Sequence, residues 1–109
     1  NGQEKSKILG TVHWQNEADN TYASYSRSYS TGGLTDDFKV YTLEWTPSSI
    51  KLFVESTQFY EMTLTETMPF DQPFFLLINL ALGGTLGGNI DDGFYTDSLI
   101  VDYIRVYQN

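Results

Sequence analysis

The segment from Pro73 to Gly88 constrains the fold of this chain more than any other part of the sequence. It reads PFFLLINLALGGTLGG, so a run of large apolar residues contains one amide, Asn79, and ends in a loop with four glycines. Its length and composition are those of a buried strand. Burying an unpaired amide costs roughly 1–3 kcal/mol. Asn79 is therefore predicted either to face a polar cleft, where a ligand can meet it, or to end the strand and bond the turn that begins at Gly83.

Periodicity along the chain indicates an all-β protein. Nearly every apolar segment alternates with polar residues or is β-branched and aromatic, and no helical repeat is sustained. We expect strands, each bounded by turn residues, at 8–15, 21–29, 38–45, 50–54, 58–64, 74–82 and 99–107. Short strands with regular turns predict a β-sandwich, as a single domain over residues 1–109. Tyr41 and Trp45 share a face of their strand and are predicted to lie in the core.

Charge and composition exclude several kinds of partner. The chain has 14 acidic and 6 basic residues, and its formal net charge of −8 predicts repulsion of nucleic acid and of anionic membranes. It has no cysteine, which rules out disulfides, thiolate catalysis and cysteine zinc sites. No apolar run approaches the ~20 residues of a membrane span. We therefore expect a neutral or cationic partner, with no nucleic acid and no membrane.

The strand predicted at 99–107 carries one carboxylate on an apolar face. Alternation places Asp102 with Ile100 and Ile104, on the face opposite Arg105. A carboxylate in such surroundings needs a cation or several backbone donors to stay ionised. Two interpretations stay open: Asp102 is an oxygen ligand of a calcium ion, or it is a rim carboxylate bonded to backbone N–H groups.

The sequence alone shows no catalytic constellation. His13, the one histidine, lies in the segment GTVHW and alternates with Trp14, so the two side chains are predicted on opposite faces of a strand. Lone histidines are more often structural than catalytic. The serines from Ser24 to Ser30 are predicted to form the exposed face of a strand in which they alternate with tyrosines. The glycine loop lacks the lysine of a phosphate-binding loop, which argues against nucleotide binding.

Four segments add a resemblance to a known family. They are GTVHW at 10–14, FKVYTLEWTPSSIKLFV at 38–54, PFDQPFFLLINLALGG at 69–84 and VDYIRVYQ at 101–108. In order and spacing they resemble the C-terminal half of laminarinase-like β-glucanases of glycoside hydrolase family 16. The resemblance implies a β-jelly roll of the concanavalin A-like type, whose concave sheet forms a glycan-binding groove. It also implies a secreted, extracellular enzyme that hydrolyses internal β-1,3 or mixed β-1,3/1,4 linkages of a glucan with retention.

The catalytic residues of that family have no counterpart in this chain. The family's catalytic strand carries Glu-x-Asp-x-x-Glu, with a nucleophile first and an acid/base last, and the sequence contains no such motif. In the family that strand comes just before the GTVHW segment, so both glutamates are expected just N-terminal to Asn1. Retaining hydrolysis needs both carboxyl groups, about 5–5.5 Å apart. We therefore expect the chain to be inactive alone and competent only with a complementary N-terminal half of the same enzyme.

The resemblance also assigns roles to residues that are present. It implies that His13 faces the cleft beside the absent acid/base, where it contacts sugar hydroxyls or orients that carboxyl. Asn79 would face the same groove, and the loop from Gly83 to Gly88 would rim it. Asp102 matches the aspartate that supplies one side-chain ligand to a structural calcium ion, whose other ligands would come from the missing half.

Two further residues are weaker substrate candidates. Trp14 is expected either in the core or in contact with sugar, and Glu44, on the face opposite Trp45, is a possible cleft residue. Three functions therefore stay open: a piece of a β-glucanase, a non-catalytic glycan-binding sandwich, or a structural module with a vestigial groove.

Overall fold

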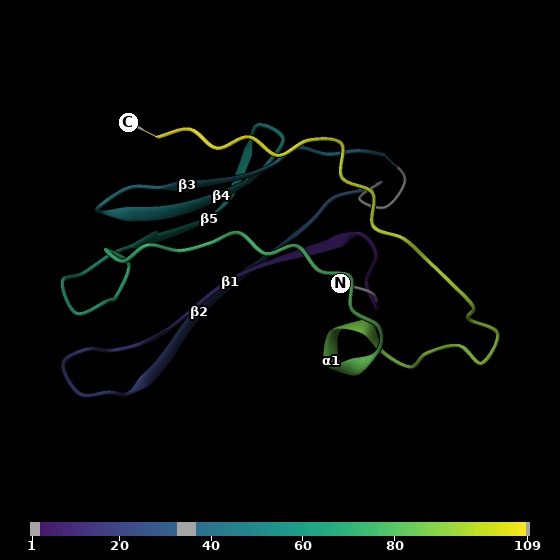
Figure 1. Cartoon of the computed structure of the whole chain (residues 1–109), viewed down its shortest axis with the longest axis horizontal. Coiled ribbons are helices and arrows are strands. Elements are labelled where there is room, and N and C mark those ends of the chain that lie inside the picture. The colour runs from purple at the N-terminus through teal and green to yellow at the C-terminus, as the bar shows by residue number, and fades with distance from the viewer. Residues whose placement is uncertain (1–2, 33–36, 109) are drawn as a thin grey trace.

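The computed structural model describes residues 3–32 and 37–108, which form two β-sheets and two long extended segments (Figure 1). All regular structure except one helical turn is β, as the sequence predicts. The strands and the turn are β1 (Lys7–Gln15), β2 (Tyr22–Ser30), β3 (Tyr41–Trp45), β4 (Ser49–Val54), β5 (Thr57–Thr63) and α1 (Gly84–Gly87). The predicted strands that end before residue 65 are thus confirmed, with bounds shifted by one to three residues.

The first sheet is the antiparallel pair β1 and β2, in register from Lys7 opposite Ser30 to Gln15 opposite Tyr22. The turn between them is closed by polar side chains. The Asp19 carboxylate accepts hydrogen bonds from the backbone N–H of Thr21 at 3.0 Å and from its hydroxyl at 2.7 Å. These bonds hold the pKa of Asp19 below its usual 3.8, because they favour the ionised form.

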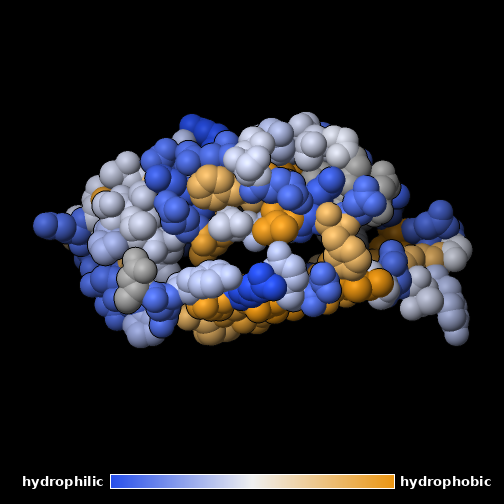
Figure 2. Space-filling model, turned by 90° about the horizontal axis from the view of Figure 1, so that it is seen from above, coloured by the Kyte–Doolittle hydropathy of each residue, from blue (hydrophilic) through white to orange (hydrophobic). Residues whose placement is uncertain are grey.

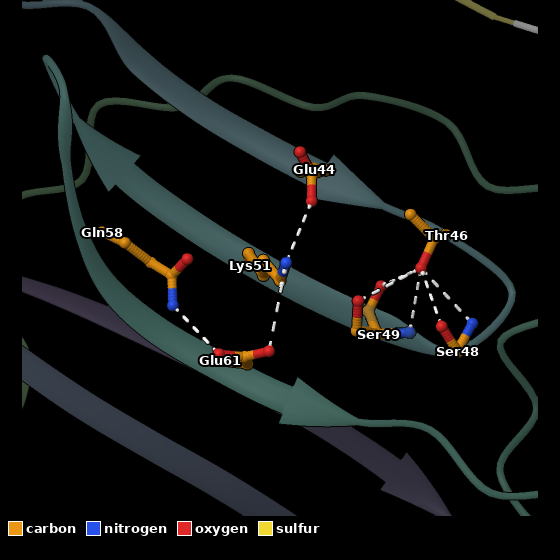
Figure 3. A network of polar contacts seen from close by, with 7 residues as sticks. All are labelled: Glu44, Thr46, Ser48, Ser49, Lys51, Gln58 and Glu61. Atoms are coloured by element: carbon orange, nitrogen blue, oxygen red, sulfur yellow. Dashed lines mark hydrogen bonds and ion pairs between the residues drawn. The ribbon is translucent and has the colours of Figure 1, made fainter.

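The second sheet has the order β3-β4-β5, and all its pairs are antiparallel. Thr46 organises the turn from β3 to β4, since its hydroxyl accepts hydrogen bonds from the backbone N–H groups of Ser48 at 3.3 Å and Ser49 at 3.1 Å (Figure 3). Between β4 and β5 the register shifts next to Leu52, and Glu55 turns the chain with a φ of 53°.

The core lies between the two sheets. Its centre is Tyr60, which is 1% exposed and lies with Ile50 and Met62 in the second sheet. The Tyr60 hydroxyl donates a hydrogen bond of 3.1 Å to the backbone oxygen of Tyr25 in β2, which ties the two sheets together. Residues of several elements pack around this centre: Val12, Trp14, Tyr25, Leu52, Phe59, Leu64, Met68 and Phe70.

Gly10 lets the two sheets approach closely. A Cβ atom on this glycine would lie 2.4 Å from Cδ1 of Leu52 and 3.1 Å from the ring of Phe59. A larger residue at this point would therefore require the Leu52 and Phe59 side chains, or the sheets themselves, to shift.

The two remaining predicted strands, at 74–82 and 99–107, are absent from the structure. Residues 73–82 and 94–108 run as extended segments without arrows, the first green and the second ending yellow at the C-terminus in Figure 1. The prediction of buried strands here was wrong, because a strand needs a neighbour for its backbone ladder and neither described sheet pairs with these segments. Their side chains are exposed as a result; Phe75 is 85% exposed and Val106 is 77% exposed.

The prediction that Tyr41 and Trp45 lie in the core was wrong for the same reason. Their strand, β3, is an edge of the second sheet, and they are 53% and 41% exposed. Phe74 meets the Trp45 ring edge-on at 5.5 Å, but no described strand covers the pair. Hydrophobic residues consequently gather in a band along one side of the molecule in Figure 2, below an opening between two layers of atoms. The helical part of the described chain, α1, is far too short to cross a bilayer.

Candidate functional site

The outer face of the first sheet is the candidate site. Val12 and Trp14 pack into the core, so the residues that alternate with them point away from the second sheet. The same alternation places the matching residues of β2 on that face. We call the part of this face around His13 the β1–β2 outer face: Leu9, Thr11, His13, Gln15, Tyr22, Ser24, Ser26 and Ser28. The same alternation continues to Lys7 and Ser30 at the far end of the two strands, which lie outside this set. None of the side chains in the set is an acid, a lysine or an arginine, and the predicted exposure of the serine-bearing face is confirmed.

His13 lies in the middle of this face and is held by an aromatic neighbour. Its Nδ1 atom shares a hydrogen bond with the hydroxyl of Tyr22, and the two rings stack with their centroids 5.8 Å apart and 27° between their planes. Ser24 lies directly opposite His13 in the ladder. His13 therefore has a defined orientation before any ligand arrives.

Other side chains of the face are also fixed by hydrogen bonds. The hydroxyls of Thr11 and Ser26 bond each other at 2.8 Å across the ladder. The amide of Gln15 donates to the backbone oxygen of Asn20 at 2.9 Å, which ties the face to the turn between β1 and β2. The result is a preorganised surface of hydroxyl, amide and imidazole groups.

Trp14 lies on the inner side of the same strand. Its indole N–H donates to the side-chain oxygen of Asn16 at 3.1 Å, and its ring meets Phe70 edge-on at 6.2 Å. The structure thus gives Trp14 a packing role and does not bring it together with His13. A contact between Trp14 and sugar stays a prediction.

Glu44 lies on the other side of the sandwich from His13. It belongs to the outer face of the second sheet. There the Lys51 ammonium lies 3.5 Å from the Glu44 carboxylate and 4.0 Å from the Glu61 carboxylate (Figure 3). Half-exposed ion pairs of this kind contribute little to stability. The structure does not place Glu44 near the β1–β2 outer face.

Asn79 and the glycine loop lie in and after the first extended segment. The Asn79 side chain is exposed and makes no hydrogen bond with the described residues, so the predicted bond to the turn at Gly83 is not seen. Its place in a glycan groove stays a prediction. In the loop, Gly83, Gly84 and Gly88 have φ values between 70° and 77°, which few other residues adopt. Gln3 holds this loop with two hydrogen bonds. Its backbone N–H donates to the backbone oxygen of Leu86 at 3.3 Å, and its side-chain amide donates to the backbone oxygen of Thr85 at 3.1 Å.

Asp102 is exposed in the C-terminal extended segment. Calcium takes six to eight oxygen ligands, and residues 3–32 and 37–108 contain no group of three acidic or histidine side chains able to hold a metal ion. Asp102 therefore belongs to no such cluster among the described residues, and its role as a calcium ligand stays a prediction.

Tyr22 is the site residue that the sequence reasoning missed. The alternation of tyrosine and serine in YASYSRSYS indicated an exposed polar face. It did not single out Tyr22, which shares the face of Ser24 because the two are two residues apart. The pairing of β1 with β2 was needed to bring Tyr22 to His13.

The chain resembles proteins of one family across nearly its whole length. Residues 1–103 match the model of the glycosyl hydrolases family 16. The clotting factor G alpha subunit of Tachypleus tridentatus is 32% identical over 108 residues, which are 94% of this chain and 16% of that protein. The beta-glucanase of Rhodothermus marinus is 42% identical over 83 residues, which are 66% of this chain and 29% of that protein.

A solved structure shows the same fold. The crystal structure of LamAcat from Zobellia galactanivorans superposes with a TM-score of 0.82 at 34% identity, over 86% of this chain and 38% of that chain. The chain thus spans well under half the length of each of these three proteins. The family match over residues 1–103 and this superposition show that the chain belongs to glycosyl hydrolase family 16.

Proposed function

We propose that the protein to which this chain belongs is a retaining endo-β-glucanase that cleaves β-1,3 or mixed β-1,3/1,4 glucan, and that this chain provides part of the substrate surface. The observation that carries the proposal is the uncharged β1–β2 outer face around His13, in a chain that belongs to family 16.

The chemistry of this face suits a neutral polysaccharide. The chain as a whole has a net charge of −8, yet the face carries hydroxyl, amide and imidazole groups only, apart from Leu9. Such groups match the donors and acceptors of sugar hydroxyls, and the exposed ring of Tyr22 offers an apolar surface beside them. Around His13 a neutral glucan meets no charged side chain of this set that it would have to desolvate; Lys7 lies at the far end of the two strands.

Hydrolysis needs groups that this face lacks. Two carboxyl groups about 5–5.5 Å apart must flank the scissile bond in a retaining enzyme, and the β1–β2 outer face contains no carboxylate. We propose that a complementary N-terminal half of the enzyme supplies both glutamates. The share of this chain is then to bind and orient the glucan against them, a contribution that orientation alone can make large.

Two further properties are proposed with this function. Asp102 would supply one ligand to a structural calcium ion whose other oxygens come from outside the described residues. The protein would act outside the cell, where it would encounter a polymeric glucan.

The glucan role of His13 is tested by His13→Ala in the complete protein. We expect kcat on a β-1,3-glucan to fall by about 10-fold to 1000-fold, because positioning and transition-state hydrogen bonds are lost. Asn79→Ala should give a smaller loss. Glu61→Gln, on the outer face of the second sheet, is the matched surface control and should leave kcat unchanged. Full activity of His13→Ala would refute the proposal, and glucan binding without any turnover by the wild type would favour a glycan-binding module.

The calcium role is tested by chelation of the complete protein. A chelator should lower the Tm of the wild type, and Asp102→Asn should remove that sensitivity. If the chelator leaves the wild-type Tm unchanged, Asp102 is not a calcium ligand.

A further inference from the structure

Tyr22 is the residue whose side chain engages the His13 ring. It is the first residue of β2, directly after the turn, and it reaches His13 diagonally across the ladder. The Tyr22 side chain is 73% exposed, so burial does not explain where its ring lies. Its hydroxyl is nevertheless hydrogen-bonded to Nδ1 of His13, and its ring is stacked on the imidazole.

The hydrogen bond to Nδ1 sets the state of the other ring nitrogen. In a neutral imidazole one nitrogen donates and the other accepts, and the partner of one nitrogen decides which. A phenol donates more readily than it accepts, because its oxygen shares electron density with the ring. With the Tyr22 O–H donating, Nδ1 is the acceptor and the proton of His13 stays on Nε2.

Neighbouring polar groups leave Nε2 available for a ligand. Thr11 and Ser26 bond each other, and the Gln15 amide is committed to the backbone of Asn20. Within the part of the chain that the structure describes, no hydrogen bond is made to Nε2 of His13. The face therefore presents one oriented ring N–H, on the residue directly opposite Ser24 in the ladder.

We infer that Tyr22 is a positioning residue of the glucan site, which locks His13 in the tautomer that donates through Nε2. The inference rests on the proposed function and sharpens it. Locked in this way, His13 donates a hydrogen bond to a sugar hydroxyl or to a catalytic carboxylate, and it does not remove a proton from the substrate. The ligand class that this donor fits is a neutral polyhydroxylated chain.

The test is nitrogen NMR of the His13 imidazole in the complete protein, without glucan, at a pH where the ring is neutral. We expect Nδ1 to give the signal of an unprotonated acceptor and Nε2 that of a protonated nitrogen. Tyr22→Phe keeps the stacked ring but removes the O–H, so the two signals should move toward a mixture of tautomers. The same variant should lower kcat on a β-1,3-glucan by about 2-fold to 10-fold, the loss expected for one hydrogen bond, with a smaller change in KM.

Tyr29→Phe is the matched control. It makes the same change on the same strand, but on the inner side, where Tyr29 stacks on Phe59 at 6.0 Å. It should alter neither the His13 spectrum nor kcat.

Two results would overturn the inference, and neither depends on glucan. One is a proton on Nδ1 of His13 in the wild type, a result that needs no variant to fold. The other is an unchanged His13 spectrum in Tyr22→Phe. A wild type that has the expected tautomer but neither binds nor cleaves a glucan would instead refute the proposed function and, with it, the role of Tyr22 in a glucan site.

Discussion

Residues 7–63 and residues 73–108 of this chain have similar β-type sequences and different structures. The first region forms five strands in two sheets, with Tyr60 1% exposed at their centre. The second region carries equally apolar runs, yet its segments 73–82 and 94–108 are extended and unpaired, and Phe75 is 85% exposed. The difference teaches that an apolar alternating segment becomes a strand only where a neighbouring backbone completes its ladder.

The comparison also indicates where further structure would pack. The exposed apolar residues of 73–108 and the uncovered side of β3 are costly to leave in water, because each buried apolar Å² contributes roughly 25 cal/mol. On the proposed function, strands of a complementary half would cover them. The following four predictions test this comparison.

Amide exchange should separate the two regions most strongly. In the isolated chain, amides of 74–82 should exchange on the order of 1000-fold faster than those of β4 and β5, because they lack ladder hydrogen bonds. In the complete protein the two rates should converge. Hydrogen–deuterium exchange with mass spectrometry measures both. Fast exchange throughout the isolated chain would break the comparison, since the paired region would then depend on the proposed complementary half as well.

Truncating one aromatic side chain in each region gives the next largest effect. Tyr60→Ala should lower the free energy of unfolding by about 3–5 kcal/mol, because it leaves a cavity in the core and removes the hydrogen bond to Tyr25. Phe75→Ala should cost little in the isolated chain, where Phe75 is exposed. Denaturant titration measures both variants. If Phe75→Ala costs as much as Tyr60→Ala in the complete protein, the second region is covered there.

Gly10→Ala tests the close approach of the sheets in the paired region. The new methyl group would overlap Leu52, so we expect a loss of about 1–3 kcal/mol in the free energy of unfolding. Gly32→Ala is the control, because a Cβ atom there would have no neighbour within 4 Å. Equal stability of the two variants would mean that the sheets are looser than the structure shows.

The smallest effect is expected from the turn between β1 and β2. The bonds from Thr21 hold the pKa of Asp19 below 3.8, so their contribution to stability is complete above about pH 4 and is lost as the pH falls through the lower folded value. Asp19→Ala should therefore lower Tm slightly at about pH 6, and the gap to the wild type should close as the pH falls below the lowered pKa of Asp19. A gap that stays constant with pH would show that the carboxylate does not stabilise this turn.

Much of the fold and part of the site were predictable from the sequence. Alternation along one strand assigned His13 and Trp14 to opposite faces, and the structure confirms this, with Trp14 packed on Phe70 and His13 outside. The paired strands and the exposed serine face of β2 were predicted for the same reason. The period of a strand is local and depends only on the pleat of its own backbone.

Only the tertiary structure decided which of these faces meet. It brought Tyr22 to His13, turned Glu44 to the far side of the sandwich, and left the segment around Asn79 without a partner. A periodic pattern states which residues share a face, but it does not state which strand lies beside them or which face is covered. Those outcomes depend on pairing between residues distant in the sequence, and on the presence of a neighbour to pair with.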